Sequence, residues 1–287
     1  GARFMAGAAA GLAWSLIAGY ARRMVSPAQQ GRAMAIAMVG TPIALSLGVP
    51  LGTWLGTAIG WQMAFVVMSG LSVLLIAWIL IAVPDYPGQK AESRISLGSV
   101  IAMPGVRAVL AVVLLWMLGH NILYTYIAPF AERASLGDRV DLVLLIFGVA
   151  SLLGIWISGY LVDRALRRSV LISLSVFALM ALGLGLFGQH PEVVLIGAAI
   201  WGLTFGGAAT FLQTALADTA GEGADVALSM NVVVWNAAIA SGSIAGGILL
   251  DAGGAGTFPW AVFILAVAGF IVTFGAHRSG FRLGSRG

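Results

Sequence analysis

The sequence of 287 residues contains no cysteine and very little charge. The absence of cysteine excludes disulfides, thiolate catalysis and thiolate metal sites in this stretch of chain. Only 9% of the residues are charged, whereas a soluble domain carries about 25%. Since 60% of the residues are hydrophobic, the apolar surface is too large to be hidden in one water-soluble core. The composition therefore predicts an integral membrane protein.

Charge is also absent from the middle of the apolar runs. All 11 acidic residues lie in loops or near the ends of the expected spans. Of the 15 Lys and Arg residues, twelve fall in connections on one side and three, Arg3, Arg133 and Arg139, on the other, which predicts a cytoplasmic first side and C-terminus. These charges form no basic face, so the expected partner is anionic membrane lipid and not nucleic acid.

Apolar runs of about 20 residues predict membrane spans. Only helices and closed barrels satisfy the backbone in lipid, and these runs are too long and too uniformly apolar for barrel strands. The expected fold is therefore an all-α polytopic membrane protein with nine spans. Their approximate limits are 3–21, 34–58, 62–83, 107–130, 141–162, 169–188, 193–216, 226–250 and 258–276.

A weak internal repeat predicts a larger protein. The stretches "SPAQQGRAMAIAMVG" at 26–40 and "TAGEGADVALSMNVV" at 219–233 both lead from a cytoplasmic loop into a glycine-rich helix. By order, the first three helices match the last three, and the middle three have no counterparts. A parallel repeat of six helices then predicts three more before Gly1 and twelve in all.

The domain limits follow from this repeat. Residues 1–84 are expected to be the last three helices of an N-terminal half, and residues 105–278 a six-helix C-terminal half. The segment 85–104 overlaps the stretch "VPDYPGQKAESRISLGSV" at 83–100, which is rich in Pro, Gly, Ser and charge. This segment is expected to be a cytoplasmic linker. Residues 279–287 are expected to be a cytoplasmic tail.

Three stretches resemble motifs of the major facilitator superfamily. "GYLVDRALRR" at 159–168 is similar to its cytoplasmic loop motif, "ARFMAGAAAG" at 2–11 to its fourth-helix motif, and "GTPIALSLGVPLGTWLG" at 40–56 to the fifth-helix motif of proton-driven exporters. The resemblance covers the chain as helices four to twelve and is closest to the drug, sugar and nucleoside efflux group. The motif residues are Arg3, Gly7, Gly48, Pro50 and Gly52 in the two helices, and Gly159, Asp163, Arg164, Arg167 and Arg168 in the loop.

Two departures from these motifs bear on the assignment to a subfamily more than on the assignment to the superfamily. Leu166 stands where the loop motif has glycine, and Gly48-Val-Pro50-Leu-Gly52 replaces Gly-Pro-x-x-Gly-Gly. In both fifth-helix and fourth-helix stretches, glycine or another small residue recurs every four positions, a pattern typical of close helix packing.

Asp163 allows two interpretations. It is either a solvated acid at a helix end, neutralised by Arg164 and Arg167, or a conformational switch that faces the positive N-terminus of a neighbouring helix. The resemblance implies that this neighbour begins near Ala33. The glycine and basic residues that accompany Asp163 favour the switch.

His120 lies near the middle of the span "LLWMLGHNILYTYIAPF". At about 100° per residue it shares one arc of the helix with Asn121 and Tyr124. An ionisable residue in the middle of a span normally faces a bundle interior or a wet cavity. The alternative is that His120 is a structural residue held by hydrogen bonds between helices alone. The resemblance implies the seventh helix, which lines the central cavity. The expected companions are Trp201, Phe205 and Asn236.

These observations favour a secondary active transporter that exports a small molecule by proton antiport with alternating access, as a monomer in the inner or plasma membrane. An uptake symporter and an inactive truncated transporter are the alternatives. The histidines at 120, 190 and 277 are far apart and no paired carboxylates share a helix face, which disfavours an enzyme, a metal site or a cofactor. The proton carrier is His120 or an acid in helices that precede Gly1.

Overall fold

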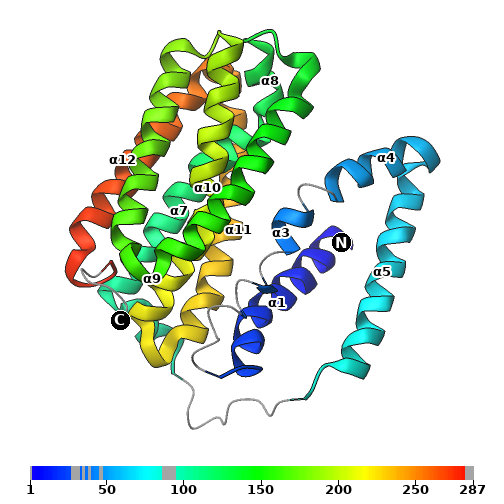
Figure 1. Ribbon diagram of the computed structural model, residues 1–287, viewed down its shortest axis with the longest axis vertical. Helices are drawn as coiled ribbons and strands as arrows, with labels where there is room; N and C mark the ends of the chain where they lie inside the picture. Colours follow the sequence, from blue (N-terminus) through cyan, green and yellow to red (C-terminus); the bar gives the residue numbers. More distant parts are fainter. Residues whose placement is uncertain are drawn as a thin grey trace. The chain divides into compact units, whose positions relative to one another are not determined.

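The computed structural model describes residues 2–26, 33, 36–37, 40–44, 48–85 and 95–281. In these ranges the regular elements are all helices (Figure 1). The chain divides into two compact units. Unit 1 comprises Gly1–Met38 and Ile95–Gly287, and unit 2 comprises Val39–Arg94. The division into an N-terminal half at 1–84 and a C-terminal half at 105–278 stays a prediction.

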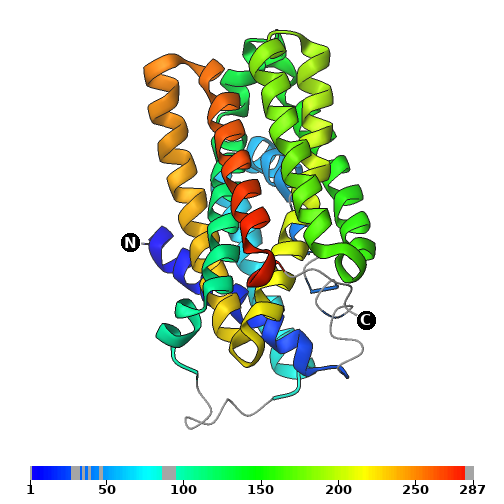
Figure 2. The ribbon, with the colours of Figure 1, turned by 90° about the vertical axis from the view of Figure 1, so that its left-hand side faces the viewer.

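Unit 1 is a helical bundle whose long helices run side by side (Figure 2). Its α-helices are α1 (Ala2–Arg23), α6 (Leu97–Ala102), α7 (Pro104–Thr125), α8 (Ile127–Glu132), α9 (Val140–Phe187), α10 (Pro191–Ala220), α11 (Ala224–Gly253) and α12 (Phe258–Gly275). Short 3-10 turns connect them: η4 (Gly137–Arg139), η5 (Gly221–Gly223), η6 (Ala255–Thr257) and η7 (Ala276–Arg278).

Five helical stretches of the described chain are long and apolar enough to cross a membrane: Trp61–Ala82, Pro104–Thr125, Gly137–Phe187, Pro191–Gly253 and Ala255–Arg278. Two of them contain 51 and 63 residues, whereas one span needs about 20. In α9 the backbone leaves the helical region at Ala165 (φ −152°, ψ 39°), inside the charged sequence "DRALRR". α9 therefore holds two spans, and η5 separates the next two, as the sequence predicts.

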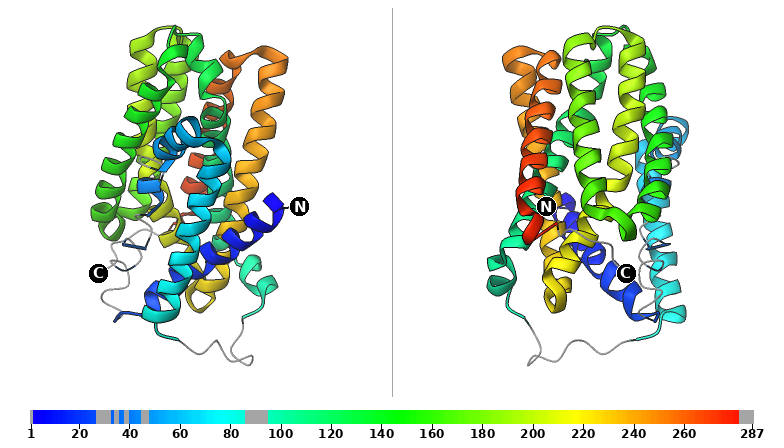
Figure 3. Two further views of the ribbon diagram at one scale, coloured as in Figure 1. Left: turned by 90° about the vertical axis from the view of Figure 1, so that its right-hand side faces the viewer. Right: turned by 60° about the vertical axis from the view of Figure 1, so that its left-hand side comes forward.

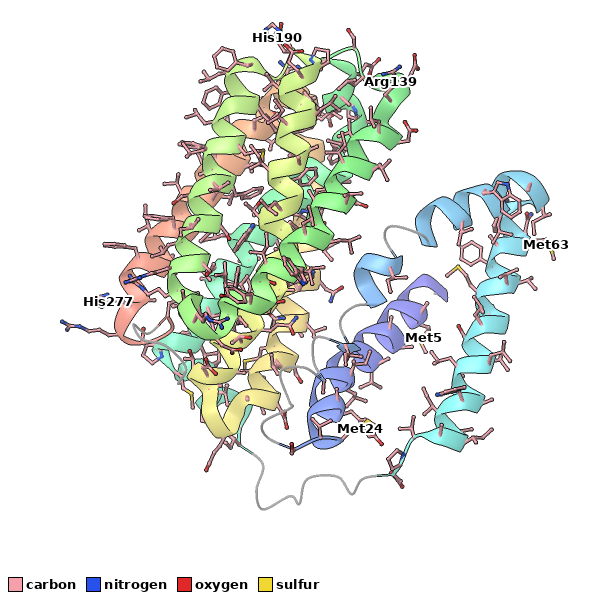
Figure 4. The ribbon with its side chains drawn as sticks, in the orientation of Figure 1. Met5, Met24, Met63, Arg139, His190 and His277 are labelled. Carbon is pink, nitrogen blue, oxygen red and sulfur yellow. The ribbon has the colours of Figure 1, made fainter. Side chains whose placement is uncertain are left out.

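The two ends of the bundle carry different residues. Arg139 and His190 lie at one end, whereas His277 lies toward the other (Figure 4). At the His277 end, Arg167 follows the break in α9, and its Nη2 donates to the backbone oxygen of Phe274 on α12 over 2.9 Å. This bond ties the break to the end of α12.

α7 is the central helix of the bundle: it packs against α10, α11 and α12, and its side chains reach the Phe147 and Phe177 rings of α9. Gly242 of α11 packs on Asn121 and the Leu118 backbone oxygen, and Gly269 of α12 packs near Leu115. The sequence predicts that His120, Asn121 and Tyr124 share one arc of α7, and Ile122 lies on the opposite arc. Ile122 is also buried, because α11 covers that side.

α9 and α10 lie side by side and pack closely through glycine (Figure 3). A Cβ built on Gly154 would collide with the backbone oxygen of Leu203, one on Gly202 with that of Phe147, and one on Gly206 with that of Ser151. Such small residues let helix backbones approach in a membrane, where packing drives association. The contact sets the positions of Trp201 and Phe205, which flank these glycines in sequence.

Unit 2 contains α3 (Gly40–Ile43), α4 (Val49–Ile59) and α5 (Trp61–Ala82). Gly60 joins α4 to α5 with φ +90°, a conformation that favours glycine. No residue of α5 is buried. Within unit 2, a Cβ added to Gly40, Gly52 or Gly56 would meet nothing within 4 Å, so a close packing partner for this glycine face stays a prediction.

Some predicted features lie outside the described residues. They include most of the linker, at 86–94, most of the tail, at 282–287, and the side chains of Arg3 and Pro50. The helix start expected near Ala33 is also largely outside them, because residues 27–32 and 34–35 are not described.

Candidate functional site

His120 lies inside unit 1 on α7 and is 7% exposed. Nε1 of Trp201, on α10, donates to its Nδ1 over 3.1 Å. An indole N–H can only donate, so Nδ1 must carry a lone pair. The bonded imidazole is therefore neutral, with its proton on Nε2.

Two rings stack on the imidazole. The Phe205 ring on α10 is centred 3.7 Å from it at an interplanar angle of 11°. The Tyr124 ring, one turn further along α7, is centred 5.3 Å away at 25°. The two rings come from different helices, Phe205 from α10 and Tyr124 from α7. A flat heteroaromatic ring thus stacks against two aromatic side chains.

Phe147 completes the cluster from α9. Its ring is centred 4.4 Å from that of Trp201 and 5.8 Å from the imidazole. Phe147 is not predicted from the sequence, because a phenylalanine within an apolar run carries no distinguishing signal. Its contact arises from the close approach of Gly202 to the Phe147 backbone. We refer to His120, Tyr124, Phe147, Trp201 and Phe205 as the ring cluster.

The two asparagines predicted to line the site behave differently. Asn121 is buried, and its Nδ2 donates to the Met117 backbone oxygen over 2.7 Å. Asn236 is exposed on α11 and bonds to the Val232 oxygen of its own helix over 2.8 Å. In both asparagines the amide NH2 group thus donates within its own helix. The structure brings His120, Tyr124, Trp201 and Phe205 together, and it does not join Asn236 to them.

Nε2 of His120 has no hydrogen-bond partner among the described residues. It is also absent from the fully buried atoms that lack one, which are Trp116 Nε1, Arg167 Nε and Asn231 Oδ1. A donor at the edge of an aromatic cluster can bind an acceptor atom of a ligand. The described part of the chain contains no buried carboxylate and no group of three potential metal ligands.

The predicted switch residues lie at the break in α9. Gly159, Asp163, Arg164 and Arg168 are exposed there. The Arg164 guanidinium lies 3.9 Å above the Tyr160 ring and donates to the Tyr160 backbone oxygen. Of the helix motif residues, Gly7, Gly48 and Gly52 are exposed within their own units.

Apolar spans packed around an interior cluster of aromatic and polar side chains define a polytopic membrane protein of the transporter class. The chain belongs to the Major Facilitator Superfamily, whose family profile matches residues 1–226 and 138–278. This match confirms the family that the three motifs predicted.

Curated relatives agree with this assignment. The chain is 34% identical over 251 residues to the purine ribonucleoside efflux pump NepI of Escherichia coli O6:H1 (strain CFT073), covering 85% of this chain and 62% of the relative. It is 33% identical over the same length to NepI of Escherichia coli strain K12, with the same coverage. The chain thus spans 62% of the length of these relatives.

Proposed function

We propose that the protein exports a small molecule with a flat heteroaromatic ring, in the first instance a purine ribonucleoside, across the inner or plasma membrane. Export proceeds by alternating access and is coupled to proton entry. The ring cluster is the substrate site. The identity to purine ribonucleoside efflux pumps supports this substrate class, and the chemistry of the cluster supports it independently.

The observation that carries the proposal is the stack of Phe205, His120 and Tyr124 beside the Trp201 donor. A heteroaromatic ring whose nitrogen accepts an N–H bond and whose plane stacks against aromatic side chains is an arrangement that also suits a nucleobase. Base stacking on an aromatic side chain is worth about 1–3 kcal/mol. An apolar site with a few placed polar groups is typical of small-molecule binding.

Transport measured with the protein expressed from its full gene tests this proposal. Cells or proteoliposomes are loaded with labelled adenosine, a sugar or a cationic drug, and efflux is followed with an imposed pH gradient of either direction. We expect adenosine efflux that rises when the external side is acidic. Uptake without efflux, or equal handling of sugar and drug, would contradict the proposal.

A variant pair links transport to the ring cluster. Phe205→Ala removes the closest stacking face and should weaken apparent adenosine affinity about tenfold or more. Phe187→Ala is the control, because Phe187 is also on a long helix but lies at the end of α9 and is 55% exposed. An equal effect of both variants would show that the cluster does not bind adenosine.

A further inference from the structure

We propose that Trp201 is a positioning residue that fixes the tautomer of His120, so that Nε2–H is the donor offered to the substrate. The role of that donor rests on the proposed function. The tautomer itself does not, because it follows from the hydrogen bond alone.

The hydrogen bond leaves one choice of tautomer. Trp201 Nε1 lies 3.1 Å from His120 Nδ1, and indole can only donate. In the tautomer with a proton on Nδ1, the Nδ1–H donor would face the Trp201 N–H donor with no acceptor between them. Imidazolium would do the same and would add a charge in the apolar interior. While the bond lasts, the proton of His120 is on Nε2.

The surroundings of Trp201 keep the bond in place. Trp201 is 1% exposed, and its ring packs against that of Phe147. The adjoining Gly202 lies so close to the Phe147 backbone that an added Cβ would collide with it, so α9 and α10 are in close contact at this level. A buried donor that loses its acceptor incurs a desolvation cost, so the paired state is favoured. Trp116 is equally buried, but its Nε1 has no partner within the described part of the chain, which makes Trp116 a suitable control.

The same bond argues against His120 as the carrier of the coupled proton. Of the residues in the ring cluster, only Tyr124 is titratable besides His120, and Phe147, Trp201 and Phe205 are not. No buried carboxylate accompanies them among the described residues. A neutral His120 with a fixed Nε2–H selects ligands that offer an acceptor, such as an unprotonated ring nitrogen or a carbonyl oxygen.

Nitrogen-15 NMR of the protein expressed from its full gene, labelled in histidine, tests the tautomer directly. The sequence contributes three histidines, and His120→Gln identifies the signals of His120. We expect Nδ1 to be unprotonated and Nε2 protonated in the parent protein and in Trp116→Phe. In Trp201→Phe the signals should shift toward a mixture of tautomers. A protonated Nδ1 in the parent, or unchanged signals in Trp201→Phe, overturns the inference.

Adenosine binding provides the second measurement. Trp201→Phe should weaken it about 2- to 10-fold, the effect of losing one net hydrogen bond, whereas Trp116→Phe should leave it unchanged. If the parent protein binds no adenosine, the proposed substrate fails while the NMR result still decides the tautomer. If adenosine binds but both tryptophan variants behave alike, the positioning role of Trp201 is wrong.

Discussion

His120 illustrates how a polar side chain is accommodated in the middle of an apolar helix. Its Nδ1 accepts from Trp201, its ring stacks against Phe205 and Tyr124, and its Nε2 has no partner among the described residues. Hydrogen bonding between helices therefore helps to stabilise the buried His120 side chain. The remaining donor is what distinguishes a binding residue from a purely structural one.

Replacement of His120 tests this distinction. His120→Ala removes the Nε2 donor and leaves the Trp201 N–H without its acceptor, so adenosine efflux should fall about tenfold. A cysteine introduced at position 120 should react with a small hydrophilic thiol reagent, and adenosine should protect it. Normal efflux by the alanine variant together with no reaction of the cysteine would assign His120 a structural role alone.

Asp163 is the second residue whose role can be measured. It is exposed at the break in α9, and asparagine has nearly the same shape as aspartate, so Asp163→Asn should leave expression and insertion nearly unchanged. We expect reduced efflux, because the variant loses a charge that biases one conformation of the cytoplasmic side. Glu222→Gln, another acid at a connection between spans, is the control. Efflux by Asp163→Asn equal to that of the parent would support the solvated-acid interpretation.

At the scale of the elements, the contact between α9 and α10 determines the geometry of the ring cluster. Gly202 and Gly206 lie one turn apart on α10, and each faces a backbone oxygen of α9. Trp201 precedes the first of these glycines and Phe205 the second. A wider spacing between the two helices would therefore move Phe147 away from Trp201.

Gly206→Ala should destabilise the bundle. The added Cβ collides with the Ser151 backbone, and overpacking of this kind costs about 1–3 kcal/mol. Gly148→Ala, on the facing helix, is the matched control, because its Cβ would meet nothing within 4 Å and alanine is the better helix former. Thermal unfolding in detergent should show a lower Tm for Gly206→Ala alone. Equal melting temperatures would mean that α9 and α10 are less closely packed than the contact between Gly206 and Ser151 indicates.

At the scale of the whole molecule, the bundle has two chemically different ends. α8 contacts both η4 and η6, which places the loops around Gly137 and Gly254 at one end. Arg164, Arg167 and Arg168 follow the break in α9, and Arg167 bonds to the end of α12 at the other. The excess of Lys and Arg predicts that this second end is cytoplasmic.

Because the sequence contains no cysteine, single cysteines can report this topology. We expect cysteines at Gly137 and Gly254 to react with an impermeant thiol reagent in intact cells, and a cysteine at Gly287 to react only after permeabilisation. Any native cysteine encoded elsewhere in the gene is replaced first. The reverse pattern would invert the proposed orientation.

The sequence by itself determined the membrane location, the helical fold and the family. Long apolar runs leave helices as the means of pairing backbone groups in lipid, and the motif residues are local in sequence. It also predicted that His120, Trp201 and Phe205 lie together, because polar and large aromatic side chains are conspicuous in such runs.

Tertiary structure decided how these residues meet. Phe147 belongs to the ring cluster and Asn236 does not. Neither outcome could be predicted from the sequence, because helix spacing and rotation depend on contacts between distant residues such as Gly206 and Ser151. Gly242 and Gly246 of α11 pack closely on α7, so the side of α7 that carries Ile122 is covered by α11. The tautomer of His120 was undetermined until Trp201, 81 positions away, supplied the donor.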